Sequence, residues 1–257
     1  PEVKGSVSRS AHPFGCKKLV ETEINYIKSK PKFKGSKKVL IIGSSSGYGL
    51  SSRIALAFGC DADTIGVSFE MPMSEKRPAT AGWWNNIWFR EFAEEAGLMA
   101  KNFVGDAFSY EMKNKVIEYI KNEFGGKIDL LVYSLASGRR TDPVTGKTYI
   151  SSLKSTTGKV DSKTIDIENE RLIPAGMDEA TEEDIANTIK VMGGEDWKMW
   201  VDFLKEAGVL ADNFKTIAYS YLGAKTTYPI YKDGTLGASK RHLEKTSNEI
   251  NEGLKEI

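Results

Sequence analysis

The sequence predicts an α/β fold built on a doubly wound parallel sheet, and three features indicate it. Short apolar runs rich in β-branched residues alternate with amphipathic helical patterns along most of the 257 residues. One early run ends in a glycine-rich turn that leads into a helix. The composition, 40% hydrophobic and 28% charged, allows a buried core and excludes a disordered chain. Alternating strands and helices form βαβ units, whose strands pair in parallel.

Each predicted strand is a short apolar run bounded by glycine or polar residues. Strands are expected at residues 38–42, 64–69, 99–104, 128–133 and 216–219. Helices are predicted where apolar residues recur every three or four positions. They are expected at residues 17–30, where Pro31 ends the pattern, and at 54–58, 83–95, 110–124, 182–191, 196–205 and 240–255.

Residues 138–181 interrupt this alternation. They are rich in Thr, Ser, Lys, Gly and Pro and contain turn signals such as Asp142-Pro143. A structureless loop of this length is unusual inside a compact domain, so we predict short hairpins that form an inserted flap over the active site at the edge of the sheet. A solvent loop without a role is the alternative.

Charge and cysteine usage exclude several classes of protein. Lys and Arg number 36 against 35 Asp and Glu, and this near-cancellation argues against a nucleic-acid partner. The apolar run at 39–42 is far shorter than the roughly 20 residues that cross a bilayer. Cys16 and Cys60 are too few for a disulfide scaffold. We therefore expect a cytoplasmic protein with no membrane partner.

The glycine-rich turn predicts a dinucleotide site and a Rossmann-like fold. Gly43, Gly47 and Gly49 follow the strand at 38–42 and precede a helix. Such glycines permit a tight turn and let the backbone approach a pyrophosphate, while the helix N-terminus supplies free N–H groups. A nucleoside triphosphate site would instead require Gly-Lys-Ser/Thr at the end of the turn.

Three further strand ends support a site for NADH. Glu70 follows the second strand, where a carboxylate can accept both ribose hydroxyls and repel a 2′-phosphate; an ordinary surface glutamate is the alternative. Asp106 and Ala107 follow the third strand, beside the expected adenine. Leu135 and Ala136 follow the fourth strand, near the expected ribose and nicotinamide. Ligands of open α/β sheets bind at this carboxyl edge.

The proton donor of a hydride transfer is predicted to be a tyrosine. His12 lies in an N-terminal turn and His242 on a charged helix face, and no metal-ligand spacing occurs. Tyr231 and Lys240 are separated by eight residues. If Tyr231 precedes a helix and Lys240 lies on its first turns, the ammonium can lower the phenol pKa and hold the nicotinamide ribose. A packing tyrosine and a solvated lysine are the alternative.

These residues resemble the trans-2-enoyl-CoA reductases and the related single-chain NADH-dependent enoyl-acyl-carrier-protein reductases of bacteria. The resemblance covers essentially the whole chain and includes the Tyr-x8-Lys spacing, whereas ordinary short-chain dehydrogenases use Tyr-x3-Lys and common enoyl reductases Tyr-x6-Lys. The matching motifs lie at residues 11–16, 43–50, 66–70, 133–137 and 191–197.

The resemblance implies the role of each site residue. It makes Tyr231 the proton donor, Lys240 an NAD contact and Tyr221 a contact of the substrate thioester. It places around NADH the residues Gly43, Ser44, Ser45, Ser46, Gly47, Tyr48, Phe69, Glu70, Asp106, Ala107, Leu135 and Ala136.

The implied reaction reduces the 2,3-double bond of a trans-2-enoyl thioester in fatty acid synthesis. A phenol hydrogen bond to the carbonyl oxygen would stabilise the developing enolate. The carrier is CoA or acyl carrier protein, and basic pairs such as Lys37-Lys38 or Arg139-Arg140 could attract an acidic carrier. A short-chain keto-reductase and a catalytically silent NAD-binding module remain alternatives.

The resemblance also implies a short-chain-dehydrogenase type of sheet and a monomer. Relatives in this family are considerably longer and continue beyond the helix at 240–255. We therefore expect residues 1–257 to be one NAD-binding enoyl reductase domain, the N-terminal part of a longer, C-terminally truncated polypeptide.

Overall fold

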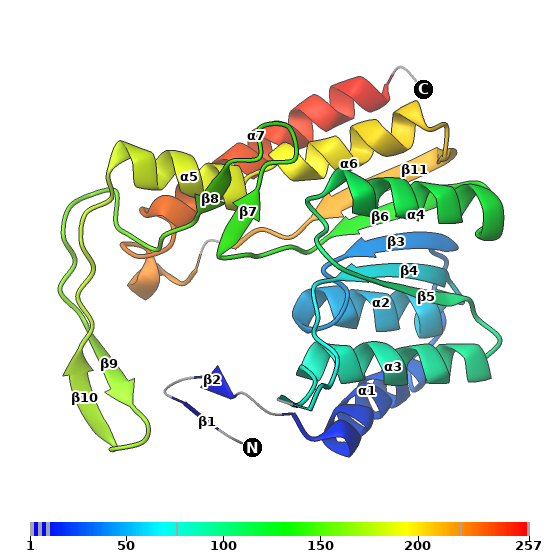
Figure 1. Cartoon of the computed structure of the whole chain (residues 1–257), viewed down its shortest axis with the longest axis horizontal. Helices are drawn as coiled ribbons and strands as arrows, with labels where there is room; N and C mark the ends of the chain where they lie inside the picture. Colours follow the sequence, from blue (N-terminus) through cyan, green and yellow to red (C-terminus); the bar gives the residue numbers. More distant parts are fainter. Residues whose placement is uncertain (1–2, 5–6, 9–10, 76, 222, 256–257) are drawn as a thin grey trace. The chain divides into compact units, whose positions relative to one another are not determined.

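The computed structural model describes residues 3–4, 7–8, 11–75, 77–221 and 223–255 (Figure 1). The chain divides into two compact units. The first, here called the sheet unit, comprises residues 1–135 and 203–219. The second, here called the helix–hairpin unit, comprises residues 136–202 and 220–257.

The sheet unit contains a five-stranded parallel sheet in the order β11-β6-β3-β4-β5 (Figure 1). Its strands are β3 (Lys38–Ile42), β4 (Asp63–Ser68), β5 (Ala100–Val104), β6 (Ile128–Tyr133) and β11 (Leu210–Ala218). The predicted doubly wound α/β fold is confirmed. β3 and β6 occupy the predicted residues, because buried parallel strands are nearly continuous apolar runs.

The start of β11 differs from its prediction. We expected this strand to begin at residue 216, but it begins at Leu210. Its pairing with β6 shifts register between Leu210 and Lys215, which is a bulge or irregularity of the ladder. The polar residues Asp212 and Asn213 lie in this interval. They interrupt the apolar run by which strands are predicted, so the first half of β11 was missed.

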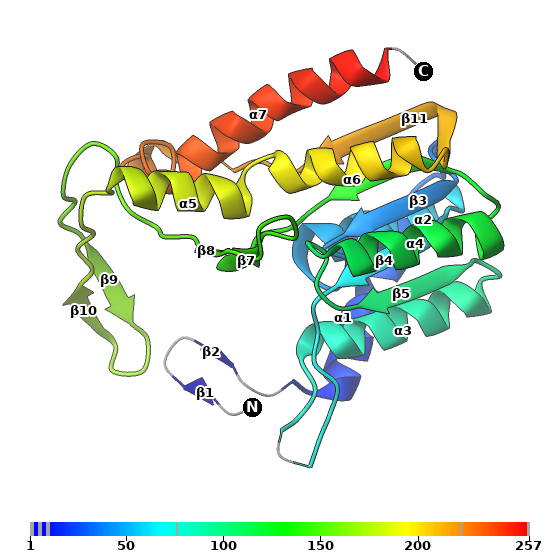
Figure 2. The ribbon, with the colours of Figure 1, turned by 45° about the horizontal axis from the view of Figure 1, so that its top comes forward.

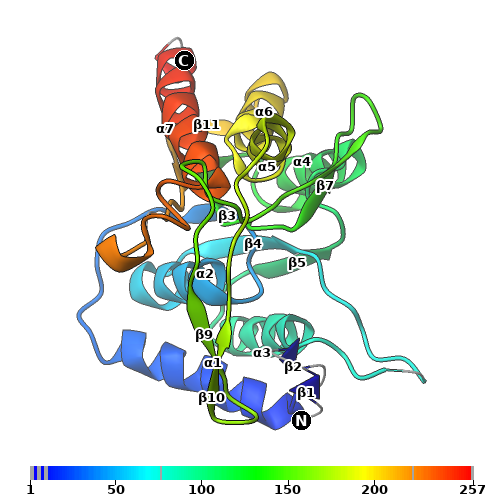
Figure 3. The same ribbon diagram turned by 90° about the vertical axis from the view of Figure 1, so that its left-hand side faces the viewer.

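The helices of the sheet unit cover both faces of the sheet. Figure 3 shows α2 and α3 below the sheet, with α1 packed against them, and α4 above it. Their bounds are α1 (Pro13–Lys28), α2 (Gly47–Cys60), α3 (Ala81–Glu95) and α4 (Tyr110–Glu123). A short antiparallel pair, β1 (Val3–Lys4) and β2 (Val7–Ser8), precedes them.

Helix α1 begins four residues earlier than its apolar pattern predicted. His12 is the N-cap, and its Nδ1 accepts the Gly15 N–H at 3.1 Å. Pro13 occupies the first helical position, where its missing N–H removes no intrahelical bond. The prediction was wrong here because we placed His12 in a separate turn and did not consider imidazole as a cap.

The core of the sheet unit lies between α1, α2, α3 and the sheet. One cluster joins the apolar faces of the three helices to the start of β5, and a second lies against β3 and β6. The first comprises Val20, Ile24, Leu50, Ile54, Ala57, Phe58, Phe89, Ala93 and Ala100. Removing these side chains from water is the main stabilising contribution in such a unit.

A fully buried arginine crosses this core. Arg53 of α2 donates to Thr64 Oγ1 at 3.0 Å, Asn102 Oδ1 at 2.6 Å and the Lys101 carbonyl at 2.9 Å. The guanidinium also lies 4.3 Å from the centroid of the Phe89 ring. Burial lowers the pKa of Arg53 to about 9. The three hydrogen bonds and the ring compensate part of the cost of removing this cation from water.

The helix–hairpin unit contains helices and two-stranded sheets in its described residues. Figure 2 shows α5 (Glu182–Met192) beside α7 (Thr235–Leu254). α6 (Glu195–Glu206) continues from this unit into the sheet unit. The hairpins are β7 (Arg139–Thr141) with β8 (Thr148–Ile150), and β9 (Lys163–Asp166) with β10 (Arg171–Pro174). Residues 138–181 therefore form short hairpins, as predicted.

Part of the predicted flap braces the beginning of α7. Thr235 N donates to the Lys154 carbonyl at 2.9 Å, and Thr156 N donates to the Asp233 carbonyl at 2.8 Å. The Thr235 hydroxyl also donates to the Ser152 carbonyl. These bonds argue against a solvent loop without a structural role.

Two general features complete the fold. In the part of the chain that the structure describes, no helix combines the length and apolar character of a membrane span. Cys16 and Cys60 are both free thiols, and burial raises the pKa of each.

Candidate functional site

The glycine-rich turn joins the end of β3 to the beginning of α2. Gly43 has φ +85° and Gly47 has φ +53°, conformations that favour glycine. A Cβ on Gly43 would overlap the Ser134 carbonyl oxygen, so the backbone after β6 lies directly against the turn. A Cβ on Gly47 would meet no described atom within 4 Å. The turn is therefore tight at Gly43 and open at Gly47.

Backbone hydrogen bonds fix the turn to the neighbouring strands. The N–H groups of Gly43 and Ser44 donate to the Val67 carbonyl at 2.8 and 3.1 Å. Ser46 is the N-cap of α2, and its side chain makes no capping hydrogen bond. The hydroxyl thus leaves the first N–H groups of α2 open to another acceptor, as a pyrophosphate site requires.

Glu70 lies beside this turn, as the sequence predicted. Ser45 Oγ donates to its Oε1 at 2.5 Å, and the Thr80 hydroxyl donates to its Oε2. The side chain is half-buried. Each carboxylate oxygen retains a lone pair, so Glu70 can still accept ribose hydroxyls while its charge repels a 2′-phosphate. This donor and acceptor pattern fits NADH.

Asp106 and Ala107 form the turn between β5 and α4. Asp106 Oδ1 accepts the Phe108 N–H at 2.9 Å. The ammonium of Lys113, a fully buried residue, donates to the carbonyls of Ala107 and Phe108, each at 3.0 Å. Sequence reasoning missed Lys113, because one lysine in a charged amphipathic helix carries no signal that it is buried.

Two aromatic rings are exposed on the segments that carry the predicted site. Tyr48 is 71% exposed and Phe69 is 76% exposed. The Tyr48 ring stacks on Tyr219 with a centroid distance of 5.3 Å. Leu135 is half-buried at the end of the sheet unit, and Ala136 is exposed at the start of the helix–hairpin unit.

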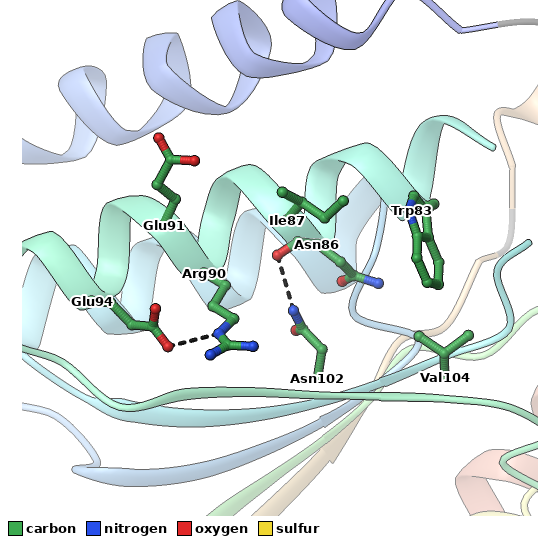
Figure 4. A pocket seen from close by; sticks show the side chains of 8 residues that line it. All are labelled: Trp83, Asn86, Ile87, Arg90, Glu91, Glu94, Asn102 and Val104. Carbon is green, nitrogen blue, oxygen red and sulfur yellow. Dashed lines mark hydrogen bonds and ion pairs between the residues drawn. The ribbon is translucent and has the colours of Figure 1, made fainter. Parts of the chain in front are cut away.

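A groove of about 470 Å³ lies between α3 and the edge strand β5 (Figure 4). Trp83 and Val104 lie at one end, and Asn102 Nδ2 donates to the Asn86 carbonyl at 2.9 Å in the middle.

Trp88 lies on the same helix, α3, and its Nε1 donates to the Pro13 carbonyl at 2.9 Å. Trp88 therefore has a structural role that joins α3 to α1.

Tyr231 lies in a turn just before α7. Its N–H donates to the Thr227 carbonyl at 3.0 Å, and its carbonyl accepts the Gly237 N–H at 2.8 Å. A Cβ on Gly237 would overlap the Lys232 carbonyl, so this turn packs closely on the first turn of the helix. The prediction that Tyr231 precedes a helix is confirmed. We expected this helix to begin at residue 240, but α7 already begins at Thr235.

Lys240 and Tyr221 belong to the same unit as Tyr231. Lys240 lies on the second turn of α7, where burial lowers the pKa of its ammonium. The rings of Tyr221 and Tyr231 meet edge to face, with centroids 5.1 Å apart and an interplanar angle of 88°. The helix–hairpin unit therefore brings Tyr221 against Tyr231, while the predicted cofactor residues up to Leu135 belong to the sheet unit.

The two histidines have structural partners. His12 caps α1, and His242 Nδ1 accepts the Gly194 N–H at 3.1 Å. His242 is half-buried, so its description as part of a charged helix face was incomplete. Among the residues that the structure describes, no three His, Cys, Asp or Glu side chains could together hold a metal ion.

One of the basic pairs suggested for a carrier protein is partly inaccessible. Arg140 is only 1% exposed and donates to Glu195 Oε1 at 3.1 Å and to the Lys190 carbonyl at 2.7 Å. The suggestion that Arg139-Arg140 attracts an acidic carrier was wrong for Arg140, because its charge is used inside the unit. Lys38 likewise forms an ion pair with Asp63 at 2.9 Å.

Two known protein families match successive parts of this chain. Residues 77–257 match the family described as the trans-2-enoyl-CoA reductase catalytic region. Residues 1–75 match the family described as the NAD(P)H binding domain of trans-2-enoyl-CoA reductase.

Curated relatives have corresponding names. The chain is 56% identical over 97% of its length to the trans-2-enoyl-CoA reductase [NADH] of Clostridium beijerinckii, of which it covers 63%. It is 55% identical over its whole length to an enoyl-[acyl-carrier-protein] reductase [NADH] of Photobacterium profundum, of which it covers 65%. The chain therefore spans a little under two thirds of the length of these relatives.

Solved structures have the same fold. The trans-2-enoyl-CoA reductase of Clostridium acetobutulicum in complex with NADH is 49% identical with a TM-score of 0.94, and the match covers 99% of this chain and 65% of that one. A short chain dehydrogenase from Mycobacterium avium, 17% identical with a TM-score of 0.50, shows the fold alone; the match covers 83% of this chain and 62% of that one. From the family matches and these identities, the chain belongs to the trans-2-enoyl-CoA reductase family.

Proposed function

We propose that this chain carries the cofactor-binding and proton-donating residues of an NADH-dependent reductase of trans-2-enoyl thioesters. The observation that carries the proposal is the arrangement in the helix–hairpin unit. Tyr231 is fixed in the turn before α7, Tyr221 packs against its ring, and Lys240 follows on the helix. The names of the curated relatives specify NADH, which supports NADH as the cofactor of this chain.

The cofactor would be held at the carboxyl edge of the sheet. The open N-terminus of α2 would receive the pyrophosphate, and Glu70 would accept the adenosine ribose hydroxyls. Asp106 and Ala107 would border the adenine. Bound NADH would supply the hydride that adds to the β-carbon of the substrate.

Tyr231 would act on the charge that develops in the substrate. Its phenol would donate a hydrogen bond to the thioester carbonyl oxygen, which becomes more negative as the enolate forms. Such a bond stabilises the transition state more than the ground state. The Lys240 ammonium would favour the phenolate form of a nearby tyrosine and hold the nicotinamide ribose. Tyr221 would contact the thioester.

The physiological setting is also part of the proposal. The relatives' names include both CoA and acyl-carrier-protein substrates, which supports a thioester substrate without selecting its carrier. We place the reaction in fatty acid synthesis in the cytoplasm, with the protein acting as a monomer. The residues 138–181 would cover the active site as a flap.

The test is NADH oxidation at 340 nm with crotonyl-CoA, comparing the unchanged chain with Tyr231→Phe. We expect turnover to fall at least about a hundredfold, as for loss of a general acid, with NADH affinity retained. Tyr228→Phe, in the preceding turn, is the matched control and should keep its turnover. Normal turnover by Tyr231→Phe would contradict the assignment of the proton donor.

The same assay separates the alternatives. A keto-reductase would oxidise NADH with acetoacetyl-CoA and not with crotonyl-CoA. A silent module would bind NADH and turn over neither substrate. Equal activity with NADPH would contradict the role given to Glu70.

A further inference from the structure

The first turn of α3 packs directly against the Glu70 carboxylate. Thr80 is the N-cap of this helix, and its hydroxyl donates to Glu70 Oε2. A Cβ on Gly82, two residues later, would overlap Oε1 and the carboxyl carbon of Glu70. Neither Thr80 nor Gly82 carries a nucleotide-binding motif, yet both touch the group that is expected to recognise the ribose.

The hydrogen bonds of Thr80 orient its single proton. The hydroxyl accepts the Met71 N–H at 3.3 Å, and the Thr80 N–H donates to the Met71 carbonyl at 3.1 Å. The Met71 carbonyl is 3.5 Å from the Thr80 hydroxyl, a much longer approach than that of Glu70 Oε2. The proton is therefore directed to the carboxylate, where a charge-assisted bond is the stronger one.

Gly82 allows this approach because it has no side chain. It is buried within the first turn of α3, and the carboxylate occupies the volume that any Cβ would fill. The position of Glu70 therefore depends on the helix backbone as well as on the Thr80 hydroxyl.

Asn85 extends the same support to the glycine-rich turn. Its Nδ2 donates to the Ser45 carbonyl at 3.0 Å, and the residue is only 4% exposed. Ser45 is the residue whose hydroxyl donates to Glu70 Oε1. Both hydroxyls that hold the carboxylate are thus positioned by α3, one from the helix itself and one through Asn85.

We propose that Thr80, Gly82 and Asn85 are positioning residues that fix the Glu70 carboxylate and thereby determine selection of a dinucleotide without a 2′-phosphate. The proposal rests on the proposed function, because it assumes that Glu70 faces the adenosine ribose. One hydroxyl holds each carboxylate oxygen, and the remaining lone pairs would face the two ribose hydroxyls. A carboxylate free to rotate would bind the ribose hydroxyls less well. It could also turn away from a 2′-phosphate, so it would repel NADPH less.

The test compares Thr80→Val with Thr80→Ser by fluorescence titration of NADH and NADPH. Valine keeps the shape and removes the hydroxyl, and we expect the preference for NADH to shrink about tenfold, mainly through weaker NADH binding. Serine restores the donor, so its preference should stay within about twofold of the unchanged chain. A merely structural role would weaken both cofactors equally in Thr80→Val, and an unchanged ratio overturns the proposal.

Gly82→Ala provides the second variant. Its methyl group displaces the carboxylate, so the preference should shrink by at least as much as in Thr80→Val, whereas Gly253→Ala, where a Cβ meets no described atom within 4 Å, should not change it. If Gly82→Ala does not fold, the valine and serine pair still decides the question.

An unchanged chain that binds neither cofactor, or both equally, overturns the proposed function as well. Selective NADH binding with an unaltered ratio in Thr80→Val overturns this inference alone.

Discussion

The two units present their predicted site residues in different ways. In the sheet unit, these residues lie at the ends of β3, β4, β5 and β6, where the ladder of a buried parallel sheet fixes the backbone. In the helix–hairpin unit, Tyr231 lies in a hydrogen-bonded turn packed on Gly237. This difference leads us to expect different functional effects from substitutions in the two units. Changes in the sheet unit should act on cofactor affinity, and changes around Tyr231 should act on turnover.

The largest expected effect tests the second half of this expectation. Lys240→Met should lower turnover with crotonyl-CoA by on the order of 10³-fold, because in the proposed mechanism the Lys240 ammonium favours ionisation of the Tyr231 phenol. Burial lowers the pKa of the Lys240 ammonium, and methionine removes this desolvation cost together with the contacts of the ammonium, so urea unfolding checks that a loss of turnover is not a loss of folding. The measurements are NADH oxidation and urea unfolding.

Lys245→Met is the matched control on the same helix. The Lys245 side chain is 77% exposed, so its loss should change neither turnover nor stability appreciably. Normal turnover in Lys240→Met, or an equal loss in both variants, would contradict a specific role for Lys240 and remove the proposed contrast between the units.

The next largest effect belongs to the sheet unit. Gly43→Ala should weaken NADH binding by about a hundredfold, because the new Cβ overlaps the Ser134 carbonyl and φ +85° is unfavourable for alanine. Gly47→Ala is the control, since its Cβ meets no described atom within 4 Å and only the backbone strain remains. Calorimetric titration with NADH measures both. Equal affinities in the two variants would show that close backbone approach at Gly43 is not required.

The same contrast explains how much the sequence could predict. In the sheet unit, β3 and β6 were located to the residue and Glu70 was expected beside the turn, because apolar runs, glycines and strand ends obey general rules. Thr80 and Lys113 were missed. Their importance depends on tertiary hydrogen bonds to Glu70 and Ala107, and neither has a local pattern that distinguishes it from other threonines or lysines.

The same general rules predicted less of the helix–hairpin unit. The spacing of Tyr231 and Lys240 alone left a packing tyrosine and a solvated lysine as an alternative, and the family resemblance was needed to favour the catalytic pair. The early start of α7 depends on tertiary contacts. Thr235 is held by the backbone of Ser152 and Lys154, about 80 residues away in sequence. No periodicity within 240–255 contains that information, so the predicted helix began too late.

A third prediction concerns the core of the sheet unit. Arg53→Met should lower the free energy of unfolding by about 2 kcal/mol, because Thr64, Lys101 and Asn102 lose a buried donor. Arg90→Met on α3 is the control, since Arg90 is exposed and donates to Glu94 Oε1 at 2.6 Å on the helix surface. Urea unfolding measures both changes. Equal stability of the two variants would mean that the buried guanidinium contributes no more than an exposed one.

The smallest expected effect lies in the helix–hairpin unit, at the start of α5. Asp184 accepts the Thr181 N–H at 2.9 Å and the Lys154 ammonium at 2.8 Å. The Lys154 hydrogen bond, followed by those from Thr181, holds the pKa of Asp184 well below its usual range. Asp184→Asn should therefore lower the free energy of unfolding by about 1 kcal/mol at neutral pH.

This effect should depend on pH in a defined direction. Because the folded pKa of Asp184 is depressed, its stabilisation is complete above its unfolded value near pH 4 and is lost as pH falls through the folded value. The stability difference between Asp184→Asn and the unchanged chain should accordingly narrow as urea unfolding is repeated from pH 7 toward pH 3. Glu182→Gln in the same helical turn is the control for a general charge effect, because Glu182 is exposed. A difference that stays constant with pH would assign the contribution of Asp184 to hydrogen-bond geometry and not to its charge.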